Sequence, residues 1–140
     1  MEINLYLANL EKEINDIKYV IELCEETNNL DKIKTLEYFL KEMESNFNEP
    51  KFIKEKFIPE LSKIKGYKGV IIFESSVGNY FNVDILIDKI NTKTENKIQK
   101  DYEIFGKESD LIFGINIHEY DSYDFDEWEN YDCLKCLVDE

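Results

Sequence analysis

Apolar residues near the start of the chain recur at intervals of three and four, which is the spacing of one face of an α-helix. They are Ile3, Leu7, Leu10, Ile14, Ile17, Ile21 and Cys24. Asn28 and Asn29 follow, and asparagine is typical of both helix ends and helix starts. A second series comprises Ile33, Leu36, Leu40, Met43 and Phe47. The pattern predicts two helices that are joined by a short turn and pack antiparallel.

A third helix is expected between Pro50 and Gly66. Pro50 suits a first helical turn, where the missing N–H of proline costs nothing, and Gly66 suits a helix end. The apolar positions of this segment are Phe52, Ile53, Phe57, Leu61 and Ile64. Pro59 falls in the middle of the segment, so we expect a break near Ile58.

From Lys68 onward the pattern changes from helical to extended. Residues 69–73 and 80–90 are apolar runs rich in β-branched side chains, and Gly78 and Asn79 suit a two-residue turn between them. We therefore expect a β-hairpin. Closed at this turn, it would pair Val77 with Tyr80, Phe73 with Asp84, and Ile71 with Leu86.

Two further extended segments are predicted. Residues 97–105 have mixed polarity and are interpreted as a solvent-facing strand rather than a short helix. Residues 111–120 alternate as a half-buried strand does. One face would carry Leu111, Phe113, Ile115 and Ile117, and the other Ile112, Gly114, Asn116 and His118.

The end of the chain is predicted to be a helix. Asp124, Asp126 and Glu127 suit the positive end of a helix dipole. Near-helical spacing then relates Phe125, Trp128, Tyr131 or Leu134, and Leu137. Together these elements predict the α+β class and one domain over residues 1–140, with residues 1–66 helical, residues 67–120 an antiparallel meander of about four strands, and residues 121–140 an acidic aromatic segment with the terminal helix.

Charge narrows the range of partners. The chain has 31 acidic and 17 basic residues, a net charge of −14, and every basic residue is lysine. This balance disfavours direct binding to nucleic acid or to an anionic membrane. No apolar run approaches the ~18 residues of a spanning helix. The start shows no secretory signal and three cysteines suit no disulfide framework, so we expect a cytoplasmic protein. Abundant Lys, Asn and Ile with a single Ala indicate AT-rich codons, as in a low-GC bacterium or its phage.

The acidic residues gather in the second half of the chain. Residues 1–70 have a net charge of −3, and residues 71–140 have −11. The densest segment has no lysine and mixes acidic with aromatic residues. It contains Glu119, Tyr120, Asp121, Tyr123, Asp124, Asp126, Glu127, Trp128, Glu129, Tyr131 and Asp132. Acids that pair with a basic partner and aromatic residues that bury apolar area are typical of interface hot spots, so we interpret these residues as a partner-binding surface.

Two other interpretations of this segment stay open. It could be a solvated acidic face whose aromatic residues belong to the core, and Trp128 in particular could be core or interface. A calcium site is disfavoured, because the acids lack the alternating spacing, central glycine and distal glutamate of a helical calcium loop.

The cysteines and the single histidine carry weaker signals. Cys133 and Cys136 form a C-x-x-C motif, but zinc would need two more ligands and only Cys24 and His118 remain. Neighbouring acids oppose a redox thiolate. We therefore expect no metal and no cofactor, and we interpret the cysteines as small apolar residues. His118 could act as a general base, but no nucleophile is positioned beside it in the sequence.

One stretch resembles a family of enzymes. Phe73-Glu74-Ser75-Ser76, the Gly78-Asn79 turn and residues 84–88 are loosely similar to the hairpin of minimal nucleotidyltransferases, in which a glycine-serine pair holds phosphates and an Asp-x-Asp pair holds magnesium. Glu74 replaces the glycine and Leu86 replaces the second aspartate. The resemblance covers about sixteen residues and implies at most a degenerate relative.

These observations favour a non-enzymatic binding protein. A small acidic protein that occupies the basic groove of a nucleic-acid-binding partner, such as a nuclease, would compete with nucleic acid and inhibit the partner. Two settings fit: a phage inhibitor of a nuclease defence system, of the anti-CRISPR kind, and an immunity protein against a nuclease toxin. The alternative is an assembly module that forms a homodimer through the helix seam that runs from Ile3 to Cys24.

Overall fold

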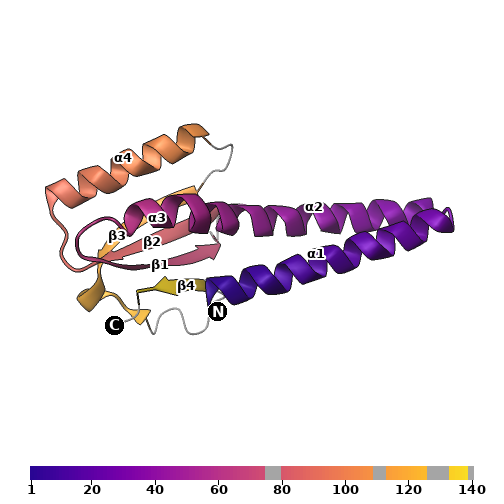
Figure 1. The fold of residues 1–140 in the computed structure, drawn as a ribbon, viewed down its shortest axis with the longest axis horizontal. Helices are drawn as coiled ribbons and strands as arrows, with labels where there is room; N and C mark the ends of the chain where they lie inside the picture. The colour runs from indigo at the N-terminus through magenta and orange to yellow at the C-terminus, as the bar shows by residue number, and fades with distance from the viewer. Residues whose placement is uncertain (75–79, 109–112, 126–132, 139–140) are drawn as a thin grey trace.

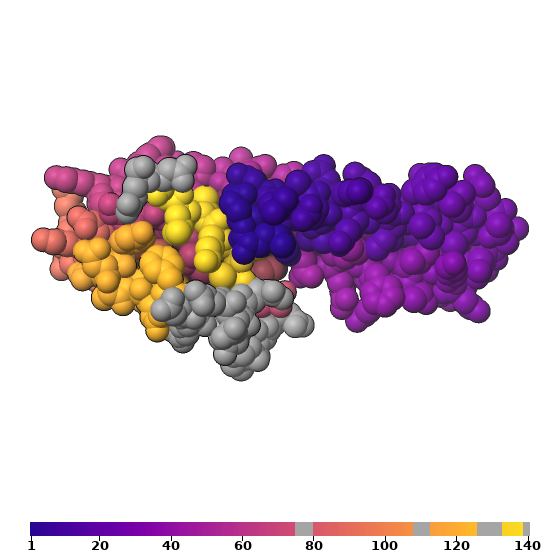
Figure 2. Space-filling model, turned by 90° about the horizontal axis from the view of Figure 1, so that it is seen from below, coloured from indigo at the N-terminus to yellow at the C-terminus, as the bar shows by residue number. Residues whose placement is uncertain are grey.

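A helical hairpin forms the first part of the molecule. The computed structural model describes residues 1–74, 80–108, 113–125 and 133–138. Helix α1 (Ile3–Glu26) and helix α2 (Leu30–Phe52) run antiparallel, and their joined end projects well beyond the sheet (Figures 1 and 2). Asn28 adopts a left-handed φ of 57°. The Asn29 side chain accepts a hydrogen bond from the Lys32 N–H at 3.4 Å. The prediction of two helices joined by an asparagine turn is confirmed.

Helix α2 does not stop at Pro50, so the prediction of a new helix there is wrong. Proline lacks an N–H and leaves the carbonyl of residue 46 without its helical donor. The Tyr6 hydroxyl donates to this Asn46 carbonyl at 3.2 Å, which explains how the helix tolerates Pro50.

A π-helical turn (Ile53–Phe57) follows α2 directly, and the short α3 (Ile58–Leu61) follows the turn. The Ile58 N–H reaches back five residues to the Ile53 carbonyl. The predicted break near Ile58 is thus present, immediately before Pro59. Gly66, with a φ of 91°, lies in the turn that leads into the sheet.

The sheet has four strands in the order β3-β2-β1-β4. Strand β1 (Tyr67–Glu74) pairs antiparallel with both β2 (Phe81–Ile87) and β4 (Cys133–Leu137). Strand β3 (Phe113–Glu119) pairs parallel with β2. The α+β class is therefore confirmed, whereas the antiparallel meander is wrong: the sheet is mixed.

Helix α4 (Thr92–Glu108) replaces the strand predicted at residues 97–105. A parallel pair such as β2 and β3 needs a crossover between its strands, and a helix is the usual one. Ile98, Asp101 and Phe105 are buried at helical spacing. The Asn91 side chain accepts from the Thr94 N–H at 2.9 Å, which is the pattern of an N-cap.

The hairpin register differs from the predicted one by two residues. Phe73 pairs with Asn82 and Ile71 pairs with Asp84. A shift of two keeps each side chain on its face of the sheet. The predicted pair of Val77 with Tyr80 and the Gly78-Asn79 turn fall on residues 75–79, outside the described residues.

The C-terminal helix is also wrong. After β3 the chain forms a 3-10 turn (Tyr120–Ser122), and residues 133–137 form β4. This strand completes the hydrogen bonding of β1 on one side. On its other side it meets the start of the chain, where the Lys135 N–H donates to the Met1 carbonyl at 2.9 Å. Backbone hydrogen bonding to β1 and Met1 therefore makes residues 133–137 a strand, although their apolar residues have approximately helical spacing.

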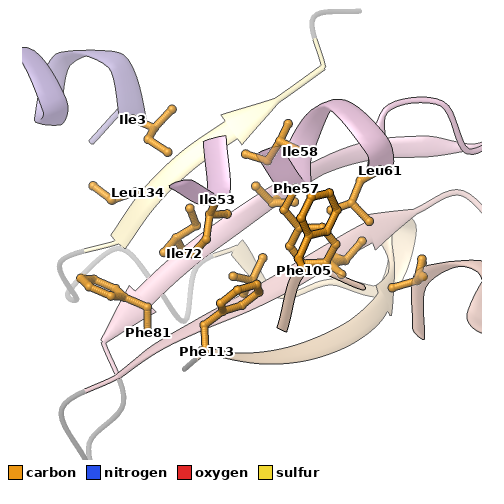
Figure 3. Packing of buried hydrophobic residues seen from close by; sticks show 14 of the residues in the cluster. Ile3, Ile53, Phe57, Ile58, Leu61, Ile72, Phe81, Phe105, Phe113 and Leu134 are labelled. Carbon is orange, nitrogen blue, oxygen red and sulfur yellow. The ribbon is translucent and has the colours of Figure 1, made fainter. Parts of the chain in front are cut away.

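Helices cover one face of the sheet. Apolar residues of β1, β2, β3 and β4 on this face pack against α1, the π-helical turn, α3 and α4 (Figures 1 and 3). The centre is Phe57, with rings of Phe105 and Phe113 at centroid distances of 5.6 and 5.4 Å. Phe113, Ile115 and Ile117 lie on this face, as the alternation in residues 111–120 predicts.

The second face of the sheet is covered more thinly. Ile71, Leu86 and Cys133 are buried there. Residues 120–125 lie over them and contribute the partly buried rings of Tyr120, Tyr123 and Phe125. In the part of the chain that the structure describes, no helix is long and apolar enough to cross a membrane.

Candidate functional site

A buried carboxylate lies on the second face, in the middle of the central strand β2. The Asp84 residue is 3% exposed. The Tyr123 hydroxyl donates to its Oδ2 at 2.7 Å, and the Asn116 amide donates to its Oδ1 at 3.3 Å. His118 Nε2 lies 3.5 Å from the same Oδ1. Asp84 therefore organises three polar side chains around itself.

The parallel pairing of β2 and β3 creates this arrangement. Asp84 is opposite Asn116, and Leu86 is opposite His118. Since alternate residues of a strand share a face, Asn116 and His118 both lie on the side of Asp84. The Tyr123 ring packs edge-on against His118 at 5.2 Å and so reaches Asp84 from above the sheet.

An open cavity of about 440 Å³ lies at these residues. Its lining combines two aromatic rings, two carboxylates and three neutral polar groups when His118 is neutral. The lining residues are Phe73, Asp84, Asn116, His118, Ser122, Tyr123 and Asp124. We call this space the Asp84 cavity.

The predicted partner-binding residues divide into two groups. Within the described part of the segment, Glu119, Asp121 and Asp124 are exposed, and Tyr120 and Tyr123 are partly buried. Asp124 and Tyr123 also line the Asp84 cavity. The remaining predicted residues fall outside the described residues, and they are Asp126, Glu127, Trp128, Glu129, Tyr131 and Asp132.

The aromatic side chains of this segment contact one another. Tyr120 and Tyr123 pack edge-on against Phe125 at 5.6 and 5.0 Å. Lys68 Nζ lies 5.9 Å from the Tyr120 ring centre. These rings hold residues 120–125 on the sheet, with the exposed acid Asp124 at the Asp84 cavity.

The C-x-x-C cysteines lie on a strand, so they do not act as a pair. Cys133 packs on the second face with Ile71, whereas Cys136 packs on the helix-covered face. Burial, and to a lesser extent Glu2, raises the pKa of the Cys136 thiol. Among the residues that the structure describes, no group of three or more His, Cys, Asp or Glu side chains is placed to hold a metal ion.

A second, smaller cavity of about 260 Å³ lies where α2 approaches one end of β1 and β2. Glu42, Glu49 and Glu74 line it together with Tyr80. Burial raises the pKa of the Glu49 carboxyl, and the charge of Glu74 raises it further. This cavity is a site of carboxylate repulsion.

Sequence reasoning singled out Asp84 and His118 for other chemistry and missed their association. Asn116, Ser122 and Phe73 were not identified as site residues. One signal was present: Asp84 is the only charged residue in the apolar run from Phe81 to Ile87. Its partners follow only from the parallel strand pair, which the sequence pattern did not indicate.

No protein-family model matches the chain, and neither the curated proteins nor the solved structures include a significant match. The residues of the site therefore carry the functional argument.

Proposed function

We propose that the protein is a small acidic, non-enzymatic binding protein that occupies the basic, nucleic-acid-binding groove of a partner protein and thereby inhibits it. The observation that carries the proposal is the position of the acids. Within the described part of the acidic segment, Glu119, Asp121 and Asp124 are exposed, and Asp124 also lines the Asp84 cavity, in a half of the chain with a net charge of −11.

The negative sign of the surface charge supports a basic partner. Carboxylates repel phosphates, so nucleic acid and anionic membranes are poor ligands for this surface. A groove that normally binds DNA or RNA exposes lysine and arginine, and it would attract the acids over a distance of about 8 Å at physiological ionic strength. The partner would be a cytoplasmic nuclease or another nucleic-acid-binding protein. A phage inhibitor of a defence nuclease and an immunity protein against a toxin remain equally suitable settings.

The hairpin supports a second candidate, an assembly module. The seam of α1, including Ile14 and Ile21, is buried within the chain, where α2 supplies its partner. The outer surface of the hairpin, however, exposes large apolar side chains. These include Tyr19, Leu30, Tyr38 and Phe39, at 61%, 68%, 64% and 50% exposure. Homodimer formation, if present, would use this outer surface, and sedimentation velocity at several concentrations measures it.

A competition experiment tests the proposed inhibition. Proteins retained by the immobilised chain from a low-GC bacterial lysate are identified, purified and loaded with labelled DNA or RNA. We expect the chain to release the nucleic acid and expect its affinity for the partner to fall as salt rises. Nucleic acid that stays bound at saturating concentrations of the chain would refute the proposal.

Two quadruple variants make the experiment specific. The first changes Asp124, Asp126, Glu127 and Glu129 to Asn or Gln and should weaken both binding and displacement. The control changes Glu11, Asp16, Glu22 and Glu26 of the exposed α1 surface in the same way. Both variants lose four charges, so equal effects would attribute binding to net charge and contradict a defined surface.

A further inference from the structure

The two buried carboxylates of the described structure differ in their partners. Asp101 is 3% exposed and has an ammonium group beside it, since Lys97 Nζ lies 2.9 Å from its Oδ1. Asp84 is equally buried, but its hydrogen bonds come from the neutral groups of Tyr123 and Asn116. Buried charges are usually paired, because desolvation penalises a lone one. Asp84 is the exception.

His118 gives Asp84 no permanent positive charge. It is the only titratable cation that the described residues place within 4 Å of Asp84, and it carries a positive charge only when protonated. The Asp84 carboxylate therefore faces an open cavity without a permanent positive charge beside it.

We propose that the Asp84 cavity receives an arginine side chain of the partner, an inference that rests on the proposed function and specifies its central contact. The guanidinium would donate its N–H groups to the lone pairs of Asp84 that accept no hydrogen bond within the described structure. Each Asp84 oxygen accepts one hydrogen bond, Oδ1 from Asn116 and Oδ2 from Tyr123, and a carboxylate offers about four acceptor positions in total. A planar guanidinium can use the remaining positions bidentately.

The walls of the cavity favour arginine over other ligands. Phe73 and Tyr123 present aromatic rings, which attract cations and stack with a planar guanidinium. Asp124 adds a carboxylate at the exposed side. An anion would meet two carboxylates, and a metal ion would lack the group of ligands that it needs among the described residues. A lysine ammonium would supply the positive charge, but it has no planar group that could donate two parallel hydrogen bonds or stack on the rings.

The test uses the folded chain and short peptides that differ in one side chain. Gly-Arg-Gly, Gly-Lys-Gly and Gly-citrulline-Gly are titrated at pH 8 while NMR follows the ring signals of His118, which are unambiguous because the chain has one histidine. We expect the signals to move with the arginine peptide, less with the lysine peptide, and not with the neutral citrulline peptide. Equal responses to arginine and citrulline, or no response to any peptide, would overturn the inference.

Charge-matched variants locate the contact. Asp84→Asn keeps the side-chain shape and removes the charge. It should weaken the binding affinity for the arginine peptide by about tenfold or more. Asp16→Asn removes one charge from an exposed position on α1, outside the proposed binding surface and the cavity lining, and it should weaken binding of the arginine peptide by less than about twofold. Equal losses would refute a specific Asp84 contact. Because the wild-type titration needs no substitution, the inference stays testable if Asp84→Asn fails to fold.

The same variants separate this inference from the proposed function. If the partner is inhibited equally by the wild type, Asp84→Asn and Asp16→Asn, inhibition stands and the arginine contact is wrong. If no partner is inhibited but the arginine peptide binds and depends on Asp84, the proposed function is wrong and the cavity is a cation site of another use.

Discussion

Removal of the Tyr123 hydroxyl should destabilise the protein even though Tyr123 is only partly buried. Its hydroxyl donates to Asp84 Oδ2 at 2.7 Å. The Asp84 side chain is only 5% exposed, so water cannot readily replace the lost donor. Hydrogen bonds to charged groups contribute about 1.5–3 kcal/mol. We therefore expect Tyr123→Phe to lower the free energy of unfolding by about 2 kcal/mol.

Urea denaturation followed by circular dichroism measures this loss. The matched control is Tyr38→Phe, because Tyr38 is 64% exposed on the helical hairpin, and its loss should stay within about 0.5 kcal/mol. In an Asp84→Asn background the Tyr123→Phe loss should shrink, since the acceptor is then neutral. A Tyr123→Phe loss as small as the control's, or one unchanged by Asp84→Asn, would refute the assignment of Asp84 as a buried charge held by Tyr123.

Three substitutions outside the Asp84 cavity test the rest of the fold. Phe57→Ala removes the fully buried ring at the centre of the core and should cost about 3–5 kcal/mol in urea denaturation. Gly69→Ala should cost about 2 kcal/mol or more in the same assay, because Gly69 has a φ of 138° and an added Cβ would lie 2.7 Å from the Cys136 carbonyl oxygen. Glu49→Gln should raise the melting temperature at pH 7, because burial and Glu74 raise the pKa of Glu49 and the ionised carboxylate is unfavourable in the folded state. That gain should vanish below the ordinary glutamate pKa of about 4.3, where Glu49 is protonated in both states, and a gain that persists there would contradict the electrostatic cause.

The helical hairpin was predictable because its information is local. Spacings of three and four match the buried positions of α1 and the partly buried positions of α2, and Asn28 and Asn29 provide the turn. Pro50 misled the prediction for a reason that no local pattern contains. The carbonyl that it leaves unpaired is satisfied by Tyr6, 40 residues earlier in the chain.

The sheet was predictable only in part, since strand pairing is a non-local property. The strands near residues 69–73, 80–90 and 111–120 were identified, but their order and the parallel pair were not. An N-cap signal at Asn91 and the helical spacing of Ile98, Asp101 and Phe105 were both available for α4. Polar residues on the exposed side of α4 concealed this spacing and favoured the interpretation as a strand.

The acidic segment and the buried aspartate became one site through two elements that the sequence pattern misassigned. Helix α4 brings β3 beside β2 in parallel, which places Asn116 opposite Asp84. The 3-10 turn at Tyr120–Ser122 and the extended backbone at Tyr123 carry residues 120–125 across the second face of the sheet, which brings Tyr123 onto Asp84 and Asp124 to the cavity. With a terminal helix and an antiparallel meander, Asp84 would have been a buried charge with no assigned partners. The mixed topology instead supplies one hydrogen bond from β3 and one from the acidic segment, so a change in how that segment packs would alter both stability and the charge that the cavity presents to a ligand.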